Sequence, residues 1–135
     1  MQGIVDINVL LKDMEPILDS EDYVFCSNKA FILNEEIIQL NPIATFLEKE
    51  GMTLVITKDI ADKNTIDYAS VFSKITLEIH SSLDAVGLTA AFSNALTSHG
   101  ISANVIAGYY HDHIFVPKDK AKLAMKALIE LTNKL

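Results

Sequence analysis

Residues 79–89 combine hydroxyls, a carboxylate and a glycine between an expected strand and an expected helix. Ser82 and Asp84 are residue types that cap helices, and Gly87 lets a ligand or a neighbouring backbone approach closely. The N–H groups of the first helical turn, over 86–89, have no partner inside the helix and would accept a carboxylate at a cleft. The alternative is that these residues only cap and pack the helix.

A second group of residues that could do chemistry contains His80, His111, Asp112 and His113. If the strand that ends near His80 pairs with the strand that begins near His113, His80 lies near His111 and His113. Imidazoles beside a carboxylate could bind zinc or transfer protons near neutral pH. Two histidines flanking an aspartate are not a dedicated metal spacing, however. The alternative is polar decoration of a turn at the edge of a strand.

The charge balance excludes several function classes. The chain has 135 residues with 18 acidic residues against 11 basic ones, and every basic residue is lysine. An acidic surface without arginine is poorly suited to phosphate backbones and base edges, so nucleic-acid binding is not expected. Residues 1–64 hold 12 acidic residues against 5 lysines, so the net charge of −7 lies entirely in this half.

The sequence lacks the signatures of several other classes. Cys26 is the only cysteine, so no disulfide can form within the chain, and a cytoplasmic protein is expected. No apolar run approaches the roughly 18 residues that span a membrane, so no membrane partner is expected. There is no glycine-rich phosphate loop, catalytic triad order or paired-carboxylate pattern. We therefore expect no cofactor and no enzymatic activity.

The second half of the chain has a clear pattern of elements. Residues 74–80 alternate as a strand with one buried face, and residues 85–99 form a helix that stops at Gly100. Two short strands, 103–107 and 113–116, precede a final amphipathic helix that starts at Lys118. This β-α-β-β-α order is a ferredoxin-like βαββαβ unit without its last strand.

The first half has elements in similar proportion. We expect a helix over 6–18, strands over 22–27, 43–50 and 52–57, a short helix over 58–63 and a connector over 64–73, and we assign nothing to 29–42. The fold class is therefore α+β, with two ferredoxin-like units, 1–64 and 65–135, in tandem or interleaved. An amino-terminal strand could complete the second sheet; the alternative is an open sheet edge covered by dimerisation.

Several segments resemble the ACT domain family. The turn and helix that end at Gly100-Ile101, followed by 104–106, match its pattern of a glycine-opened helix and a Gly-Ile step into the second strand. Segments 50–55, 75–83 and 108–117 resemble short bacterial tandem ACT-like proteins, which are similar to the paired ACT domains that follow aspartokinase catalytic domains. The resemblance spans nearly the whole chain except residues 29–42.

The resemblance implies a regulatory protein that binds a small molecule, usually an amino acid, at a domain or subunit interface, and that forms a homodimer. The family's first strand-helix turn and facing second strand map onto nine positions of this chain: Ser82, Leu83, Val86, Gly87, Leu88, Thr89, Asn104, Val105 and Ile106. Two alternatives remain: a small metal-binding protein or enzyme built on the histidine group, and an interaction module without a ligand.

Overall fold

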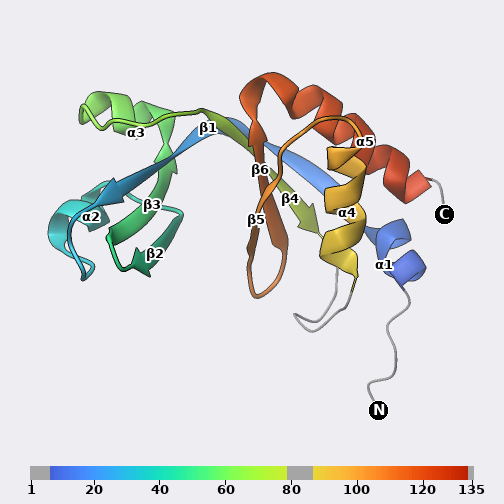
Figure 1. Ribbon diagram of the computed structural model, residues 1–135, viewed down its shortest axis with the longest axis horizontal. Helices are drawn as coiled ribbons and strands as arrows, with labels where there is room; N and C mark the ends of the chain where they lie inside the picture. Colours follow the sequence, from blue (N-terminus) through green and yellow to red (C-terminus); the bar gives the residue numbers. More distant parts are fainter. Residues whose placement is uncertain (1–6, 79–86, 134–135) are drawn as a thin grey trace, which may run out of the picture. The chain divides into compact units, whose positions relative to one another are not determined.

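The computed structural model describes residues 7–78 and 87–133, and Figure 1 shows the course of the chain. The elements in chain order are α1 (Ile7–Asp13), β1 (Glu15–Asn28), α2 (Glu35–Gln39), β2 (Ala44–Glu48), β3 (Gly51–Thr57), α3 (Lys58–Lys63), β4 (Phe72–Glu78), α4 (Leu88–Thr97), β5 (Asn104–Ala107), β6 (Asp112–Pro117), the 3-10 turn η1 (Lys118–Lys120) and α5 (Ala121–Asn133). Among these described residues, no helix is long and apolar enough to cross a membrane.

The strands form one six-stranded sheet in the order β2-β3-β1-β4-β6-β5. Strand β3 pairs antiparallel with both β1 and β2, and β5 pairs antiparallel with β6. The run β4-α4-β5-β6-α5 reproduces the predicted β-α-β-β-α order, and β1 lies next to β4 where the missing strand belongs. The ferredoxin-like prediction is therefore confirmed in its interleaved form.

The chain packs into two compact units. The central unit is residues 20–72, and the terminal unit is Met1–Asp19 together with Ser73–Leu135. The long strand β1 contributes its first residues to the terminal unit and its remainder to the central unit. The two units are defined by which residues pack together. The boundary expected between residues 64 and 65 divides the repeats along the sequence instead, and it stays a prediction.

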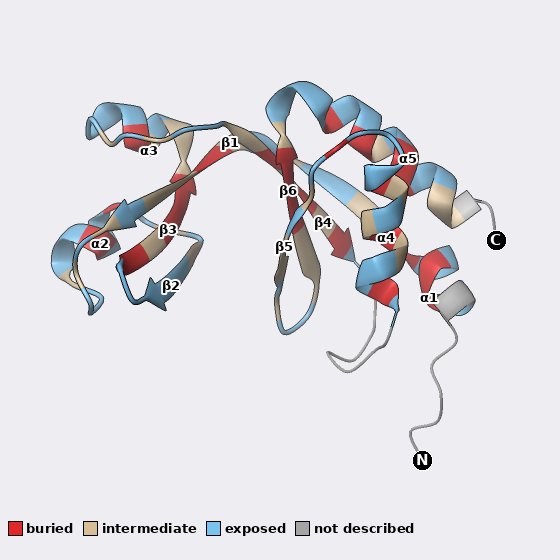
Figure 2. Cartoon of the chain, viewed as in Figure 1, coloured by how far each residue is buried: buried red, intermediate tan, exposed pale blue. Residues whose placement is uncertain are grey.

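The core of the terminal unit lies between its strands and the helices α1, α4 and α5. Helices α4 and α5 contact each other, and α1 contacts both. The buried residues alternate along β4 and follow helical spacing on the helices, and they are red in Figure 2: Leu10, Leu11, Met14, Ile75, Leu77, Leu88, Phe92, Leu96, Ile101, Ile114, Val116, Ala124, Ala127 and Leu128. Burial of each such leucine, isoleucine or phenylalanine side chain stabilises the fold by about 1.5–3 kcal/mol.

The central unit has its own smaller core. It contains residues of β1 and β3 packed against α2 and α3: Val24, Ile37, Leu40, Met52, Leu54, Ile56 and Ala61. Strand β3 begins at Gly51, whose φ is +147° and where an added Cβ would lie 2.6 Å from the carbonyl oxygen of Asn28. The turn between β2 and β3 therefore requires glycine at position 51.

The structure corrects the first predicted helix. Helix α1 ends at Asp13 and β1 begins at Glu15, although the apolar spacing suggested a helix over 6–18. Pro16 explains the difference, because proline has no N–H group to donate inside a helix and disfavours helical geometry in the residue before it. The unassigned segment contains the short helix α2, capped by Asn34, whose Oδ1 accepts from the Ile37 N–H at 2.8 Å.

Candidate functional site

Helix α4 begins directly after Gly87. This residue is the N-cap with φ +91° and ψ −13°, a left-handed conformation that favours glycine, and it provides no side-chain cap. The Ala91 N–H donates to the Gly87 carbonyl at 3.0 Å and begins the helical pattern. Leu88 is buried in the core, whereas Thr89 is exposed. The first-turn N–H groups therefore follow a glycine in the left-handed conformation, at the positive end of a ten-residue helix.

Three predicted turn residues, Ser82, Leu83 and Val86, lie outside the described residues, as does His80. The structure describes the remaining predicted positions of this site, which are Gly87 to Thr89 on α4 and Asn104 to Ile106 on β5.

Strand β5 places its three predicted residues on two faces. Val105 packs against the same core cluster as Leu88, so the start of α4 and β5 contribute to one core. Asn104 and Ile106 lie on the opposite face because side chains alternate along a strand. The Asn104 amide Nδ2 donates to the carbonyl oxygen of Phe115, across the β5–β6 pair, at 3.3 Å.

Strand β5 is also the last strand in the sheet order. One side of its backbone therefore has no neighbouring strand within the described sheet, and these N–H and C=O groups can bind a ligand or another chain. The Asn104 side chain is occupied by its own hairpin, so the edge backbone is the better candidate for a ligand contact.

The histidine group is only partly assembled in the described residues. His113 lies in β6, and its Nδ1 is 3.0 Å from the Thr76 hydroxyl oxygen on β4. His111 precedes the strand, and its Nδ1 is buried and has no hydrogen-bond partner among the described residues. No group of three histidine, cysteine or acidic side chains that could hold a metal ion occurs among residues 7–78 and 87–133.

Burial controls the ionisation of this group. Desolvation lowers the pKa of His113, and the positive charges of Lys74 and His111 lower it further, while Asp112 acts in the opposite direction. Desolvation also raises the pKa of Asp112. Both shifts favour the neutral forms of the two side chains, as expected for partly buried groups beside the turn of the β5–β6 hairpin.

The hairpin tip next to this group exposes two tyrosines. Tyr109 and Tyr110 are 80% and 76% exposed, and their rings meet edge to face with centroids 5.0 Å apart. The Gly108 N–H donates to the His111 carbonyl at 2.9 Å and closes the turn. Neither tyrosine belongs to the core.

A hollow in the central unit was not predicted from the sequence. Its volume is about 580 Å³, and its lining residues come from β1, β3 and the segment after α3: Phe25, Cys26, Ser27, Thr53, Asp67, Tyr68 and Ala69. No residue pattern marked it, because segment 64–73 has the composition of a plain connector and its position depends on tertiary contacts.

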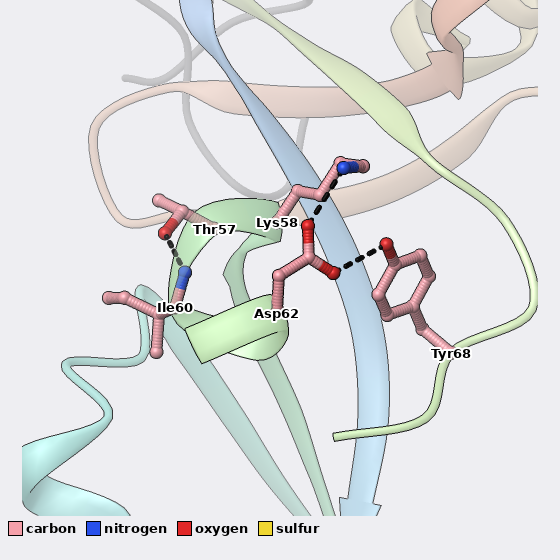
Figure 3. A network of polar contacts seen from close by, with 5 residues as sticks. All are labelled: Thr57, Lys58, Ile60, Asp62 and Tyr68. Atoms are coloured by element: carbon pink, nitrogen blue, oxygen red, sulfur yellow. Dashed lines mark hydrogen bonds and ion pairs between the residues drawn. The ribbon is translucent and has the colours of Figure 1, made fainter. Parts of the chain in front are cut away.

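A polar network holds this connector to α3 (Figure 3). The Asp62 carboxylate accepts from the Lys58 ammonium and from the Tyr68 hydroxyl, each at 2.8 Å. The hydrogen bond from Lys58 and then that from Tyr68 lower the pKa of Asp62, while the carboxylate raises the pKa of both partners. Thr57 caps the same helix by accepting from the Ile60 N–H at 3.3 Å.

The central unit also exposes large apolar side chains, which we call the apolar surface. They lie between the end of β1 and the end of β2: Phe31, Ile32, Leu33, Ile38, Ile43, Phe46 and Leu47. Strand β2 is the first strand in the sheet order, so these side chains lie beside a strand edge that no other described strand pairs with. Exposed apolar side chains beside an open edge are typical of a surface that another chain covers.

Comparisons with known proteins agree with this architecture. Two family models, each described as an ACT domain, match residues 2–73 and 70–130. No curated protein matches the chain.

Solved structures match over most of the chain. A protein of unknown function from Vibrio cholerae, described as a possible transport protein, is 51% identical, with a TM-score of 0.85 and coverage of 93% of this chain and 95% of that one. The ligand-free regulatory subunit of aspartate kinase from Thermus thermophilus is 12% identical, with a TM-score of 0.63 and coverage of 86% and 95%. Aspartokinase III from E. coli is 8% identical, with a TM-score of 0.62. The match covers 90% of this chain and 33% of the aspartokinase chain. The last two likenesses concern the fold.

Proposed function

Because the chain belongs to the ACT domain family and carries two such domains in tandem, we propose that it is a non-catalytic regulatory protein that binds an amino acid or a similar small metabolite. The observation that carries this proposal is the first turn of α4. Its N-cap residue is Gly87, which has no side chain to accept from the backbone N–H groups of that turn. The family supports the ligand class, since ACT domains typically bind small molecules.

The chemistry of the chain limits how such a ligand is held. No arginine is available, so a carboxylate would be bound by backbone N–H groups near Leu88 and Thr89. The amino group of the ligand would meet carbonyl oxygens on the free edge of β5, at 104–106. Ser82, Leu83 and Val86 remain proposed members of this site.

We propose a second copy of the chain as the macromolecular partner, in a homodimer located in the cytoplasm. The apolar surface and the open edge of β2 support this, because a two-fold axis would pair two identical edges and cover both sets of apolar side chains. Ligand binding would transmit a signal only if its affinity differed between two subunit arrangements.

A thermal-shift screen with variants tests the site. Thr89→Trp adds a bulky side chain at an exposed position of the first turn, and Thr97→Trp is the matched control at the exposed far end of the same helix. An amino acid that stabilises the protein should lose its effect with Thr89→Trp and keep it with Thr97→Trp. If both variants respond like the unaltered protein, the ligand does not bind at this turn.

The second candidate function is an interaction module without a ligand, which the apolar surface favours. This alternative predicts that no metabolite changes the melting temperature, while mass measurement still shows a complex. The same screen with metals and a chelator tests the histidine alternative. A stoichiometric metal that is lost with His113→Ala would favour a metal-binding protein over the regulatory one.

A further inference from the structure

The hollow of the central unit lies where three segments meet. Ser27 of β1 and Thr53 of β3 are register partners, and they lie on the sheet face opposite the core residues Met52 and Leu54. Residues 67–69 of the connector complete the lining, and of these Tyr68 packs against the core cluster of the unit. The hollow has a volume of about 580 Å³ and opens broadly to solvent.

This part of the connector is held by specific contacts. The Tyr68 hydroxyl donates to Asp62, and the Ile66 N–H donates to the Ala61 carbonyl at 2.9 Å. Further along the chain, Phe72 meets the Phe25 ring edge to face, with centroids 5.3 Å apart. The segment that lines the hollow is thus fixed to α3 at one end and to β1, through Phe72, at the other.

The lining favours an apolar ligand with a positive charge. Phe25 and Ala69 supply apolar surface, Ser27 supplies a hydroxyl, and Asp67 supplies a carboxylate. The hydroxyl of Thr53 already donates to the Glu48 carboxylate. None of the described residues that line the hollow is a lysine, and residues 20–72 as a whole hold nine acidic residues against four lysines. An anion would meet a net negative surface here, whereas an ammonium group would be attracted.

We propose that this hollow binds a small primary amine with an aromatic body, whose ammonium group pairs with Asp67 and whose ring packs on Phe25. The site is separate from the turn at Gly87 and does not depend on the regulatory function proposed above. It shares no residue with that turn, so the two proposals can fail independently.

Three probes of similar shape and different charge test the proposal: phenethylamine, phenethyl alcohol and phenylacetate. Titrations are followed by the backbone amide signals of the isotope-labelled protein. Phenethylamine should shift the signals of Ser27, Thr53 and Ala69, the neutral alcohol should bind several-fold more weakly, and phenylacetate should bind least. Equal binding of phenylacetate and phenethylamine, or shifts confined to other segments, would overturn the proposal.

Variants separate the site from the general charge of the unit. Asp67→Asn should weaken phenethylamine binding about two- to five-fold, which is the range of an exposed ion pair. The matched control is Asp59→Asn, an exposed acid on α3 outside the lining, and it should leave binding unchanged. Equal weakening by both variants would show that only net charge acts, against the proposal.

A filling variant gives an independent check. Ser27→Trp places an indole at an exposed strand position in the lining and should abolish the phenethylamine shifts. Thr89→Trp, which blocks the turn of α4, should leave them unchanged. Undiminished binding to a folded Ser27→Trp protein would place the amine elsewhere and contradict the proposal.

Discussion

Leu11 tests the interleaved packing because it precedes β1 in sequence yet is only 4% exposed in the core of the terminal unit. Leu11→Ala removes three carbon atoms from that core, a transfer loss of about 2.4 kcal/mol at about 0.8 kcal/mol for each. The cavity left behind adds to this loss, so we expect about 3–4 kcal/mol in total. Ile17→Ala is the control, since Ile17 is 40% exposed and should cost about 1 kcal/mol or less.

Hydrogen exchange is the suitable assay, because two compact units need not unfold as one. The amides of Phe92 and Leu96 should exchange about 150- to 700-fold faster in Leu11→Ala, because each 1.4 kcal/mol is about a factor of ten, while those of Leu54 and Ile56 change much less. Acceleration of the central-unit amides alone would refute the assignment of α1 to the terminal unit. A cost below about 0.5 kcal/mol would refute the burial of Leu11 itself.

Two further predictions concern a turn and a titration. Gly51→Ala should destabilise the central unit by several kcal/mol, because its Cβ would lie 2.6 Å from the Asn28 carbonyl oxygen; a urea midpoint equal to that of the unaltered protein would contradict the close approach. Burial, Lys74 and His111 lower the pKa of His113, so the unfolded chain takes up this proton first as the pH falls. The contribution of His113 is therefore complete above its unfolded pKa of about 6.5 and is lost below it. Urea midpoints between about pH 7.5 and 5.5 should fall less in His113→Gln than in the unaltered protein; identical slopes would contradict this origin. The raised pKa of Asp112 acts in the opposite direction and at lower pH, because its folded form binds the proton first.

The parts of the fold that follow from local pattern were predictable. Alternation over 74–78, helical spacing from Leu88 to Leu96 and the short helix expected over 58–63 each correspond to an observed element. The start of β1 was not predicted. Leu10, Leu11 and Met14 have helical spacing, and Leu18 continues that spacing by coincidence although it already belongs to the strand. Spacing alone does not show that a chain has already left the helix.

The candidate site was predictable to a similar extent. Gly87 at the start of a helix follows from the sequence, and its left-handed conformation agrees with that position. The two faces of β5 were not predictable, since they depend on which of Asn104 and Val105 faces the core. The hollow beside Asp67 was also missed, because it exists only where the connector returns to β1.

The left-handed conformation of Gly87 decides which variant tests ligand binding at the start of α4. With φ +91°, a β-branched residue at this position would be strained whether or not a ligand binds there. Gly87→Val would therefore lower stability and obscure any loss of binding. Thr89→Trp is the cleaner change because Thr89 is exposed and has ordinary helical geometry.

The most direct measurement is a map of amide shifts with an amino acid that stabilises the protein in the thermal screen. The regulatory function predicts the largest shifts at Leu88 and Thr89 and along 104–106, with weak changes in residues 20–72. Shifts confined to the central unit, or no binding by any amino acid, would contradict an amino-acid site at the start of α4.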